Sequence, residues 1–269
     1  MCEIKNIIIT GASSGLGKAL AFELASCGAN LTLAARRIEL LEELKQEINK
    51  KYPKSQILVI KTDITNQNSC ENLIHESIKY FGALDIFIAN AGQSMWSRFC
   101  DIKNPKELDN LMQLNYMGVV YAAFYALPYL RQSHGSFVAI SSIQGALPVP
   151  FHTGYVASKY ALTGFIDALR LEEKNIHFLL AMPSWISGTE LRNHALRGQA
   201  PGSIEVKKNH GKNNAISARE CAELIIKALK AKKNKIYIPN RYKYLVALRQ
   251  FFPALIDYLI LKRVKKQLR

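Results

Sequence analysis

Short runs of apolar residues alternate along the chain with longer segments in which apolar residues recur at helical spacing. The runs are NIIIT at 6–10, LTLAA at 31–35, ILVIK at 57–61, LDIFIAN at 84–90, SFVAIS at 136–141, IHFLLAM at 176–182 and KIYIP at 235–239. Each run is apolar throughout rather than at alternate positions, which is typical of parallel strands covered on both faces. Seven such strands separated by helix-length segments predict an α/β fold with a doubly wound parallel sheet.

The alternation is interrupted once, at residues 188–216. This segment reads GTELRNHALRGQAPGSIEVKKNHGKNNAI, is rich in Gly, Asn and Lys, and shows no apolar periodicity, so we predict a long insertion. Ser217 and Glu220 then have the spacing of a capping box, which predicts the start of a helix that ends near Lys230.

The pattern changes again in the last part of the chain, at residues 241–269. Apolar residues recur there at helical intervals, with Pro253 as a predicted break: Tyr244, Leu245, Leu248, Phe252, Leu255, Ile256, Leu259 and Ile260. The stretch is too short and too interrupted to span a bilayer, which takes about 20 apolar residues. It is typical of a helix that lies in a membrane interface, although packing against a dimer partner is an alternative. We predict one domain over 1–240 and an amphipathic tail over 241–269.

Charge is concentrated in the same part of the chain. The 269 residues carry a formal net charge of +15, and residues 230–269 hold twelve Lys and Arg with Asp257 as their one acidic residue, hence 12 − 1 = +11. A basic tail can bind nucleic acid, but interleaved Leu, Ile and Phe suit a lipid surface better than a phosphate backbone. We therefore expect peripheral membrane contact and no nucleic-acid partner.

The cysteines and the first residues bear on the cellular compartment. Cysteines at 2, 27, 70, 100 and 221 show neither paired nor metal-like spacing, so we expect reduced thiols in a cytoplasmic protein and no metal site. The chain enters an apolar strand within a few residues of Met1, and no signal peptide is expected.

A glycine-rich turn, TGASSGLG at 10–17, follows the first predicted strand and precedes a helical segment. Its glycines at 11, 15 and 17 allow a tight turn and let a pyrophosphate approach the N–H groups at a helix N-terminus. Such a turn can be purely structural, but between a strand and a helix it favours phosphate binding.

Two further positions after strands suggest how a dinucleotide would be recognised. Arg36 and Arg37 stand at the end of the second strand, where an acidic residue would select the ribose of NAD; guanidinium groups there suit a 2′-phosphate and favour NADP. The alternative is a solvated arginine pair. Asp63, after the third strand, could accept a hydrogen bond from the adenine amine or cap the following helix.

Tyr155 and Lys159 lie four residues apart, which on a helix places both side chains on one face. A phenol is a poor acid or base at neutral pH, and a neighbouring ammonium is expected to lower its pKa. The same spacing occurs at Tyr258 and Lys262, so it is weak evidence alone.

Taken together, TGASSGLG, NAG at 90–92, LNYMG at 114–118, Ser142 and YVASK at 155–159 resemble the classical short-chain dehydrogenase/reductase family, over about residues 5–240. The resemblance implies a Rossmann-type sheet and a catalytic tetrad of Asn115, Ser142, Tyr155 and Lys159. In the family, the tyrosine is the general acid/base, the lysine also bonds the nicotinamide ribose, the serine holds the substrate carbonyl oxygen, and the asparagine supports a proton-relay water. Tyr258 and Lys262 lack these surroundings.

The resemblance also implies a nicotinamide cofactor, NADP(H) in view of the two arginines. The positions expected to bind it are Gly11, Ser13, Ser14, Gly15, Leu16, Gly17, Arg36, Arg37, Asp63, Ile64, Asn90, Ala91, Gly92, Tyr155, Lys159, Pro183, Ile186 and Thr189. One motif departs from the family pattern: in PSWISGT at 183–189, Ser184 replaces a glycine and Gly188 replaces a threonine that contacts the nicotinamide. Thr189 can substitute by a shift of one residue; if that contact is lost, the chain could be a cofactor-binding regulatory or scaffold protein with little turnover.

Residues near the family's pocket positions in sequence form a large, apolar set: Gln144, Phe151, Met95, Trp96 and Trp185. Such a set suits a lipid, a steroid or a long-chain ketone better than a sugar, although for any one of them an ordinary place in the core is an equal alternative. The tail and VAISSIQG at 138–145 most resemble a membrane-associated branch that includes acyl/alkyl-dihydroxyacetone-phosphate reductase-like enzymes. The family usually forms homodimers or homotetramers through helices expected at about 106–131 and 155–173.

Overall fold

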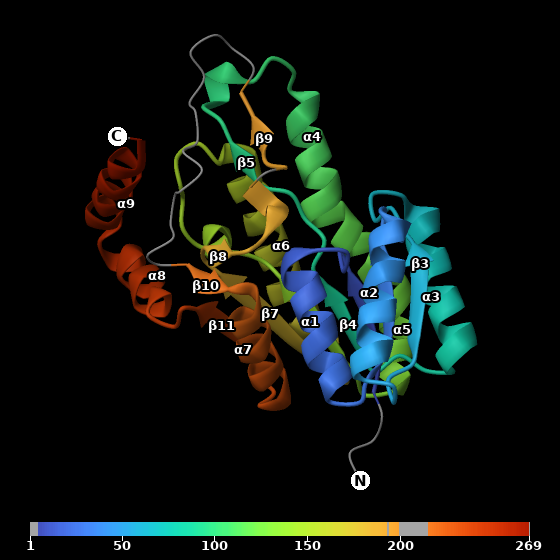
Figure 1. Cartoon of the computed structure of the whole chain (residues 1–269). Helices are drawn as coiled ribbons and strands as arrows, with labels where there is room; N and C mark the ends of the chain where they lie inside the picture. Colours follow the sequence, from blue (N-terminus) through green and yellow to red (C-terminus); the bar gives the residue numbers. More distant parts are fainter. Residues whose placement is uncertain (1–4, 193, 199–214, 269) are drawn as a thin grey trace.

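A seven-stranded sheet lies at the centre of the computed structural model, which describes residues 5–192, 194–198 and 215–268 (Figure 1). The strands are β1 Asn6–Thr10, β2 Asn30–Ala35, β3 Ile57–Lys61, β4 Ile86–Ala89, β6 Ser136–Ile140, β7 His177–Pro183 and β11 Lys235–Ile238. Every neighbouring pair is parallel, and the order across the sheet is β11-β7-β6-β4-β1-β2-β3. The seven predicted strands and the doubly wound parallel sheet are confirmed.

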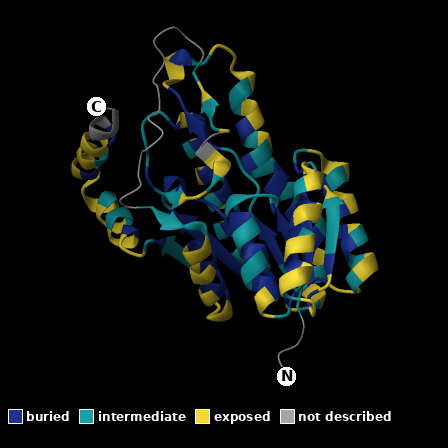
Figure 2. Ribbon diagram, viewed as in Figure 1, coloured by how far each residue is buried: buried dark blue, intermediate teal, exposed yellow. Residues whose placement is uncertain are grey.

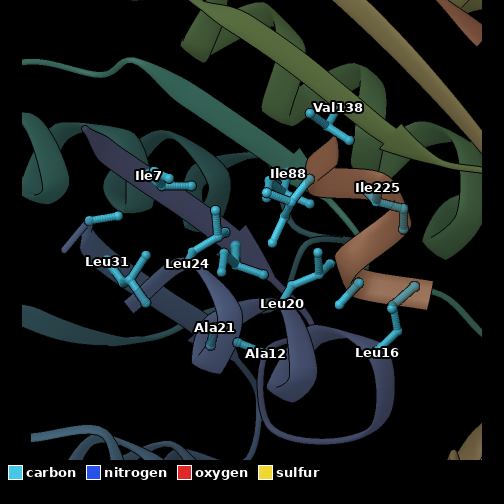
Figure 3. Packing of buried hydrophobic residues seen from close by; sticks show 14 of the residues in the cluster. Ile7, Ala12, Leu16, Leu20, Ala21, Leu24, Leu31, Ile88, Val138 and Ile225 are labelled. Atoms are coloured by element: carbon cyan, nitrogen blue, oxygen red, sulfur yellow. The ribbon is translucent and has the colours of Figure 1, made fainter. Parts of the chain in front are cut away.

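Helices cover both faces of this sheet. One core cluster holds side chains of α1 Gly15–Ser26, α2 Ile38–Lys51 and α7 Ala218–Lys230, and part of it is drawn in Figure 3. A second cluster holds side chains of α3 Gln67–Phe81, α5 Gly118–Gln132 and α6 Thr153–Glu172. In β1, Ile7 and Ile9 belong to the first cluster and Ile8 to the second, because successive side chains of a strand point to opposite faces. Both faces are therefore buried, which explains the continuous apolar runs.

Two helix starts show how local sequence sets the element boundaries. The Ser217 hydroxyl accepts a hydrogen bond from Glu220 N at 3.1 Å, and the Glu220 carboxylate accepts one from Ser217 N at 3.0 Å, so the predicted capping box starts α7. At α3, the cap is the Asn66 side chain, which accepts from Ser69 N at 3.0 Å. The alternative that Asp63 caps this helix is wrong, because Asp63 lies three residues too early and instead accepts from the backbone N–H of Thr65 at 3.0 Å.

The predicted insertion is tied to the body of the protein at both ends. Its described residues include η4 Glu190–Arg192 and β9 Leu196–Arg197, while β8 Ile186–Ser187 lies just before it and β10 Ile216–Ser217 at its end. β8 pairs with β10, and β9 pairs with β5 Met95–Trp96, which follows β4. Residues 193 and 199–214, to which part of the insertion prediction applies, lie outside the described residues.

Shorter helical segments lie between β4 and α6. They are η1 Phe99–Asp101, α4 Lys106–Met112, the π-helical segment η2 Gln113–Met117 and η3 Ile143–Gly145. α4, η2 and α5 follow one another without a break, so the chain is helical from Lys106 to Gln132. π-helical segments occur frequently at functional sites.

The tail forms two helices, α8 Tyr242–Phe251 and α9 Pro253–Leu268, separated where Pro253 predicts a break. Tyr242 and Ile256 are buried against Ile143 and Leu147, which follow β6. Most other apolar side chains of α8 and α9 are exposed, as the yellow surface of these helices indicates in Figure 2. The tail is thus held to the body by a small apolar cluster.

Two findings bear on the environment of the protein. Within the described ranges, no helix combines the length and the apolar character needed to cross a bilayer. Cys27, Cys70, Cys100 and Cys221 are free thiols, while Cys2 lies outside the described residues.

Candidate active site

A cavity of about 490 Å³ opens at the carboxyl ends of the strands. Much of its lining comes from the segments that follow β1, β2, β3, β4, β6 and β7. β1 and β4 are neighbours in the sheet although β2 and β3 lie between them in sequence, so the strand order reverses at this point. Open α/β sheets bind their ligands at such a reversal.

The glycine-rich turn forms one wall of the cavity. Gly11 has φ +65° and Gly15 has φ +55°, both in the left-handed region that favours glycine. A Cβ on Gly17 would collide with the carbonyl oxygen of Gly11, so only glycine fits there. The Asn90 amide donates to the carbonyl oxygens of Thr10 and Gly11 at 3.0 and 3.1 Å, and thereby holds the turn against the segment after β4.

The start of α1 fits the phosphates of a dinucleotide. Its N-cap residue Ser14 makes no side-chain capping hydrogen bond, and the first turn carries no acidic residue. The N–H groups of this turn are therefore free of a side-chain cap, and the helix dipole favours an anion beside them. Ser13, Ser14, Gly15 and Leu16 line the cavity here, whereas Gly17 is buried behind them.

Both arginines after β2 line the same cavity. The Arg37 guanidinium donates to the hydroxyls of Ser13 and Ser14 at 3.3 and 3.1 Å and forms an ion pair with Glu190 at 3.2 Å. Arg36 is exposed to solvent. Positive charge thus lies beside the turn, where an adenine ribose would extend from the phosphates. Asp63 and Ile64 line the cavity nearby.

Tyr155 and Lys159 lie on α6 with their side chains buried at the base of the cavity. The Lys159 ammonium donates to the carbonyl oxygen of Ile140 at 2.9 Å, which fixes it at the end of β6. Ser142 follows that strand, and its hydroxyl lies near enough to the Tyr155 phenol to lower the pKa of that phenol. Three of the four predicted catalytic side chains are thus brought together.

The choice of Ser142 over Ser141 agrees with the surroundings of the two hydroxyls. Ser141 Oγ lies 3.3 Å from the Thr163 hydroxyl and 3.5 Å from the carbonyl oxygen of Lys159, so it is used within the scaffold. Ser142 Oγ accepts from Gln144 N at 3.1 Å and lies 3.4 Å from the carbonyl oxygen of Pro183.

The acid–base properties of the pair differ from the expectation. Burial raises the pKa of the Tyr155 phenol to about 12, and the Ser142 hydroxyl offsets only part of this rise. Burial also lowers the pKa of Lys159 to about 8. The expected lowering of the phenol pKa by the ammonium is not found, because desolvation of the buried phenol is the larger effect. Tyr155 is therefore protonated at neutral pH, as a proton donor must be.

Asn115 lies in the π-helical segment and is fully buried. Its side-chain oxygen accepts from Gln93 N at 2.9 Å, and its amide nitrogen donates to Gln93 O at 2.9 Å and to Ser158 Oγ at 3.0 Å. Asn115 thus ties the segment after β4 to α6 and is not among the described residues that line the cavity. The bond to Ser158 was not expected from the sequence.

The turn that departs from the family pattern lies against the phosphate-binding turn. Gly188 has φ +72°, which explains the glycine at this position. Thr189 lines the cavity, and its side chain lies 3.2 Å from where a Cβ on Gly15 would be. Pro183 and Ile186 also line the cavity, so the positions that the resemblance implies remain beside it despite the change of motif.

Four of the five predicted substrate residues line the cavity: Met95, Trp96, Gln144 and Trp185. Phe151 is not among the described residues that form the lining, and its contact with substrate stays a prediction. Its backbone has φ +67°, and its ring lies against Trp96, with the ring centroids 6.2 Å apart. Lining residues that sequence reasoning missed include Ser94, Leu114, His152, Glu190 and His194. Ser94 lies two residues after NAG and could have been found; His194 belongs to the insertion, where no pattern singles it out.

Comparison with protein families identifies residues 5–200 as matching the short chain dehydrogenase model. The chain is 32% identical over 255 residues to "11-beta-hydroxysteroid dehydrogenase-like 3" of Arabidopsis thaliana, covering 94% of this chain and 79% of the relative. It is 35% identical over 262 residues to "Dehydrogenase/reductase SDR family protein 7-like" of Dictyostelium discoideum, covering 95% of this chain and 80% of the relative.

Solved structures agree with the fold. A short chain dehydrogenase/reductase from Burkholderia phymatum, in complex with NAD, superposes with a TM-score of 0.82 at 22% identity, covering 94% of this chain and 95% of that one. An alcohol dehydrogenase from Thermococcus sibiricus, complexed with 5-hydroxy-NADP, superposes with a TM-score of 0.78 at 24% identity. The superposition covers 87% of this chain and 96% of that one. At these identities the likeness establishes the fold.

Proposed function

Because this chain belongs to the short chain dehydrogenase family, and is thus an NAD(P)-dependent oxidoreductase acting on carbonyl and alcohol groups, we propose that it reduces a ketone on an apolar substrate with NADPH. The observation that carries the proposal is that Ser142, Tyr155 and Lys159 all line the cavity that the glycine-rich turn borders. A proton donor, a second hydroxyl and an anion-binding turn within one cavity are what hydride transfer to a carbonyl requires.

The side chains divide the work as follows. The bound cofactor supplies the hydride that adds to the carbonyl carbon. Tyr155 donates its phenolic proton to the carbonyl oxygen, so that the C=O group becomes CH–OH, and it then regains a proton from solvent. Ser142 holds the same oxygen by a hydrogen bond. The ammonium of Lys159 stabilises the phenolate that forms when Tyr155 gives up its proton. Asn115 positions Gln93 and α6 around these groups.

The preference for NADPH rests on Arg36 and Arg37. Both line the cavity beside the phosphate-binding turn, and a guanidinium binds a phosphate group with charge-assisted hydrogen bonds. Glu190 pairs with Arg37 at 3.2 Å, but both side chains are about half exposed, so this ion pair is weak and can yield to a 2′-phosphate.

The apolar character of the substrate is supported by the side of the cavity away from the phosphate-binding turn. Met95, Trp96 and Trp185 meet there, with the two indole ring centroids 6.4 Å apart. Aromatic and thioether side chains around a few polar groups are typical of sites for apolar ligands. A sugar would leave many hydroxyls without partners.

We further propose that the enzyme acts in the cytoplasm at a membrane surface, to which α8 and α9 bind. Exposed apolar side chains on both helices support this, among them Phe251 at 75% and Leu255 at 56% exposure, together with the charge of +11 over residues 230–269. Basic residues attract an anionic surface and apolar side chains enter the interface. The same features support a place in the branch resembling acyl/alkyl-dihydroxyacetone-phosphate reductase-like enzymes.

We also propose a homodimer or homotetramer built through α5 and α6. The ends of these helices lie side by side, since Arg131 donates to the Glu173 carboxylate at 2.7 Å, and they expose Phe124 at 70% and Leu171 at 56%. Replacing Phe124 by Asp should lower the mass measured by light scattering to that of a monomer; a wild-type protein that is already monomeric would contradict the proposal.

The function is tested by a screen of ketones, including long-chain and steroid ketones, with NADPH and NADH. We expect NADPH oxidation with an apolar ketone, and Tyr155→Phe should lower kcat at least about 10²-fold while NADPH binding persists. Tyr258→Phe, in the second Tyr-x-x-x-Lys, is the matched control and should leave kcat unchanged. If every ketone fails while NADPH binds, the chain is better described as a cofactor-binding regulatory or scaffold protein.

A further inference from the structure

Among the described residues, two buried polar atoms of the active-site cavity have no hydrogen-bond partner within the protein. They are the side-chain oxygen of Gln144 and the hydroxyl oxygen of Ser184, and both residues line the cavity. Gln144 is only 9% exposed, so its amide is buried. Most buried polar side-chain atoms in proteins have a partner, and each exception needs an explanation.

Both residues flank the catalytic serine. The backbone N–H of Gln144 donates to Ser142 Oγ at 3.1 Å, and Ser184 directly follows Pro183, whose carbonyl oxygen lies 3.4 Å from the same Oγ. The two segments are neighbours because β6 and β7 pair in the sheet. The residues that carry the unpartnered atoms therefore belong to the two segments whose backbone contacts the Ser142 hydroxyl.

A buried polar group without a partner destabilises the folded protein. In a site that binds a substrate hydroxyl, such polar groups stay unpaired until the substrate binds. A substrate that lacks the hydroxyl leaves them unpaired and therefore binds more weakly. Ser184 replaces a glycine of the family pattern, and a glycine would carry no hydroxyl at this position. Met95, Trp96 and Trp185 line the same cavity with mainly apolar side chains.

We propose that Gln144 and Ser184 form a polar subsite that binds a hydroxyl group on the carbon next to the substrate ketone. A hydroxyl can both donate and accept, so it satisfies the Gln144 amide in either orientation of its oxygen and nitrogen, and the Ser184 hydroxyl as well. The substrate class is then an α-hydroxyketone with an apolar chain. This inference rests on the proposed ketone reduction and narrows its substrate.

The test compares two ketones that differ only in this hydroxyl, 1-hydroxydecan-2-one and decan-2-one, with NADPH as reductant. We expect wild-type kcat/KM to favour the hydroxyketone by about 10- to 100-fold, the range that one or two buried hydrogen bonds produce. Gln144→Leu and Ser184→Gly should each remove most of this preference, because they lower kcat/KM for the hydroxyketone more than for decan-2-one. Gln46→Leu, at an exposed site on α2, is the control and should change kcat/KM for neither ketone.

A second readout does not depend on turnover. If the side-chain oxygen of Gln144 has no partner in the free protein, Gln144→Leu should leave the midpoint temperature of thermal unfolding unchanged or raise it. A lower midpoint would mean that the protein itself satisfies the amide, and this would overturn the proposal. Equal kcat/KM for the two ketones in the wild type, or equal losses on both ketones in the variants, would also overturn it while leaving ketone reduction intact. Failure of the wild type on all ketones would overturn both.

Discussion

Lys159 Nζ lies 5.8 Å from the centroid of the Tyr155 ring, one helical turn away on the same face of α6. The ammonium donates to the carbonyl oxygen of Ile140 at 2.9 Å, and both side chains are buried. Burial moves their pKa values in opposite directions, to about 12 for Tyr155 and about 8 for Lys159. At neutral pH both groups are protonated, which is the state needed to donate a proton to a ketone.

The first prediction concerns pH. The pKa of Lys159 is lowered from 10.5 to about 8, so its ammonium is complete below that pH and is lost as the pH rises through it. We expect kcat/KM for NADPH, which reports groups of the free enzyme, to fall above about pH 8. In Lys159→Arg the guanidinium stays charged, so this alkaline limb should move upward even if the rate is lower throughout. A wild-type profile that stays flat to pH 10 would contradict the assignment.

The second prediction concerns the buried network of Asn115. Asn115→Ala removes the partner of both Gln93 backbone groups and one of two partners of the Ser158 hydroxyl, which still donates to Tyr155 O at 2.8 Å. Leaving such buried groups unpaired costs about 1–3 kcal/mol, so the free energy of unfolding in urea should fall by about that amount. Asn110→Ala, at an exposed position on α4, is the control and should stay within about 0.5 kcal/mol of wild type. Equal stabilities of the two variants would show that the network is not structural.

The third prediction concerns the arginines after β2. Arg36→Ala and Arg37→Ala should each weaken NADPH binding by about 1.5–3 kcal/mol, the contribution of a hydrogen bond to a charged group. NADH lacks the 2′-phosphate, so its binding should change little and serves as the internal control. Titration calorimetry on the same preparations measures both affinities. Losses of the same size for NADH and NADPH would mean that the arginines support the fold rather than read the phosphate.

The fourth prediction concerns the tail. Phe251, Leu255 and Leu259 are exposed at 75%, 56% and 45%, and replacing all three by Glu should lower binding to anionic phosphatidylserine vesicles at least about tenfold in 1 M salt. Wild-type binding should weaken but persist at that salt concentration, because salt screens charges and leaves apolar burial intact.

Substitution is a better test of the tail than truncation, since Tyr242 and Ile256 are buried against Ile143 and Leu147. Truncation would remove Tyr242 and Ile256 and so expose the apolar side chains of Ile143 and Leu147, close to Ser142. Phe99→Glu, at an exposed phenylalanine outside the tail, is the matched control and should sediment with vesicles as the wild type does. Wild-type protein that stays in solution with anionic vesicles at low salt would contradict membrane binding.

The sequence by itself determined the sheet, the capping box of α7 and the glycine-rich turn, because each depends on residues close together in the chain. Continuous apolar runs report burial on both faces, and the glycines report a local backbone conformation. The spacing of Tyr155 and Lys159 could likewise be predicted from helix geometry alone.

The tertiary structure decided what depends on burial and on contacts between distant segments. The sequence could not show that burial raises the pKa of Tyr155, since that cost comes from the whole cavity wall around the phenol. Phe151 has a left-handed backbone and its ring lies against Trp96, and it is not among the described residues that line the cavity. The unpartnered oxygens of Gln144 and Ser184 exist only where β6 and β7 bring two distant segments together around Ser142. These pKa shifts, ring contacts and unpartnered atoms arise from solvent exclusion and from packing between distant segments, so they cannot be predicted from a local sequence pattern.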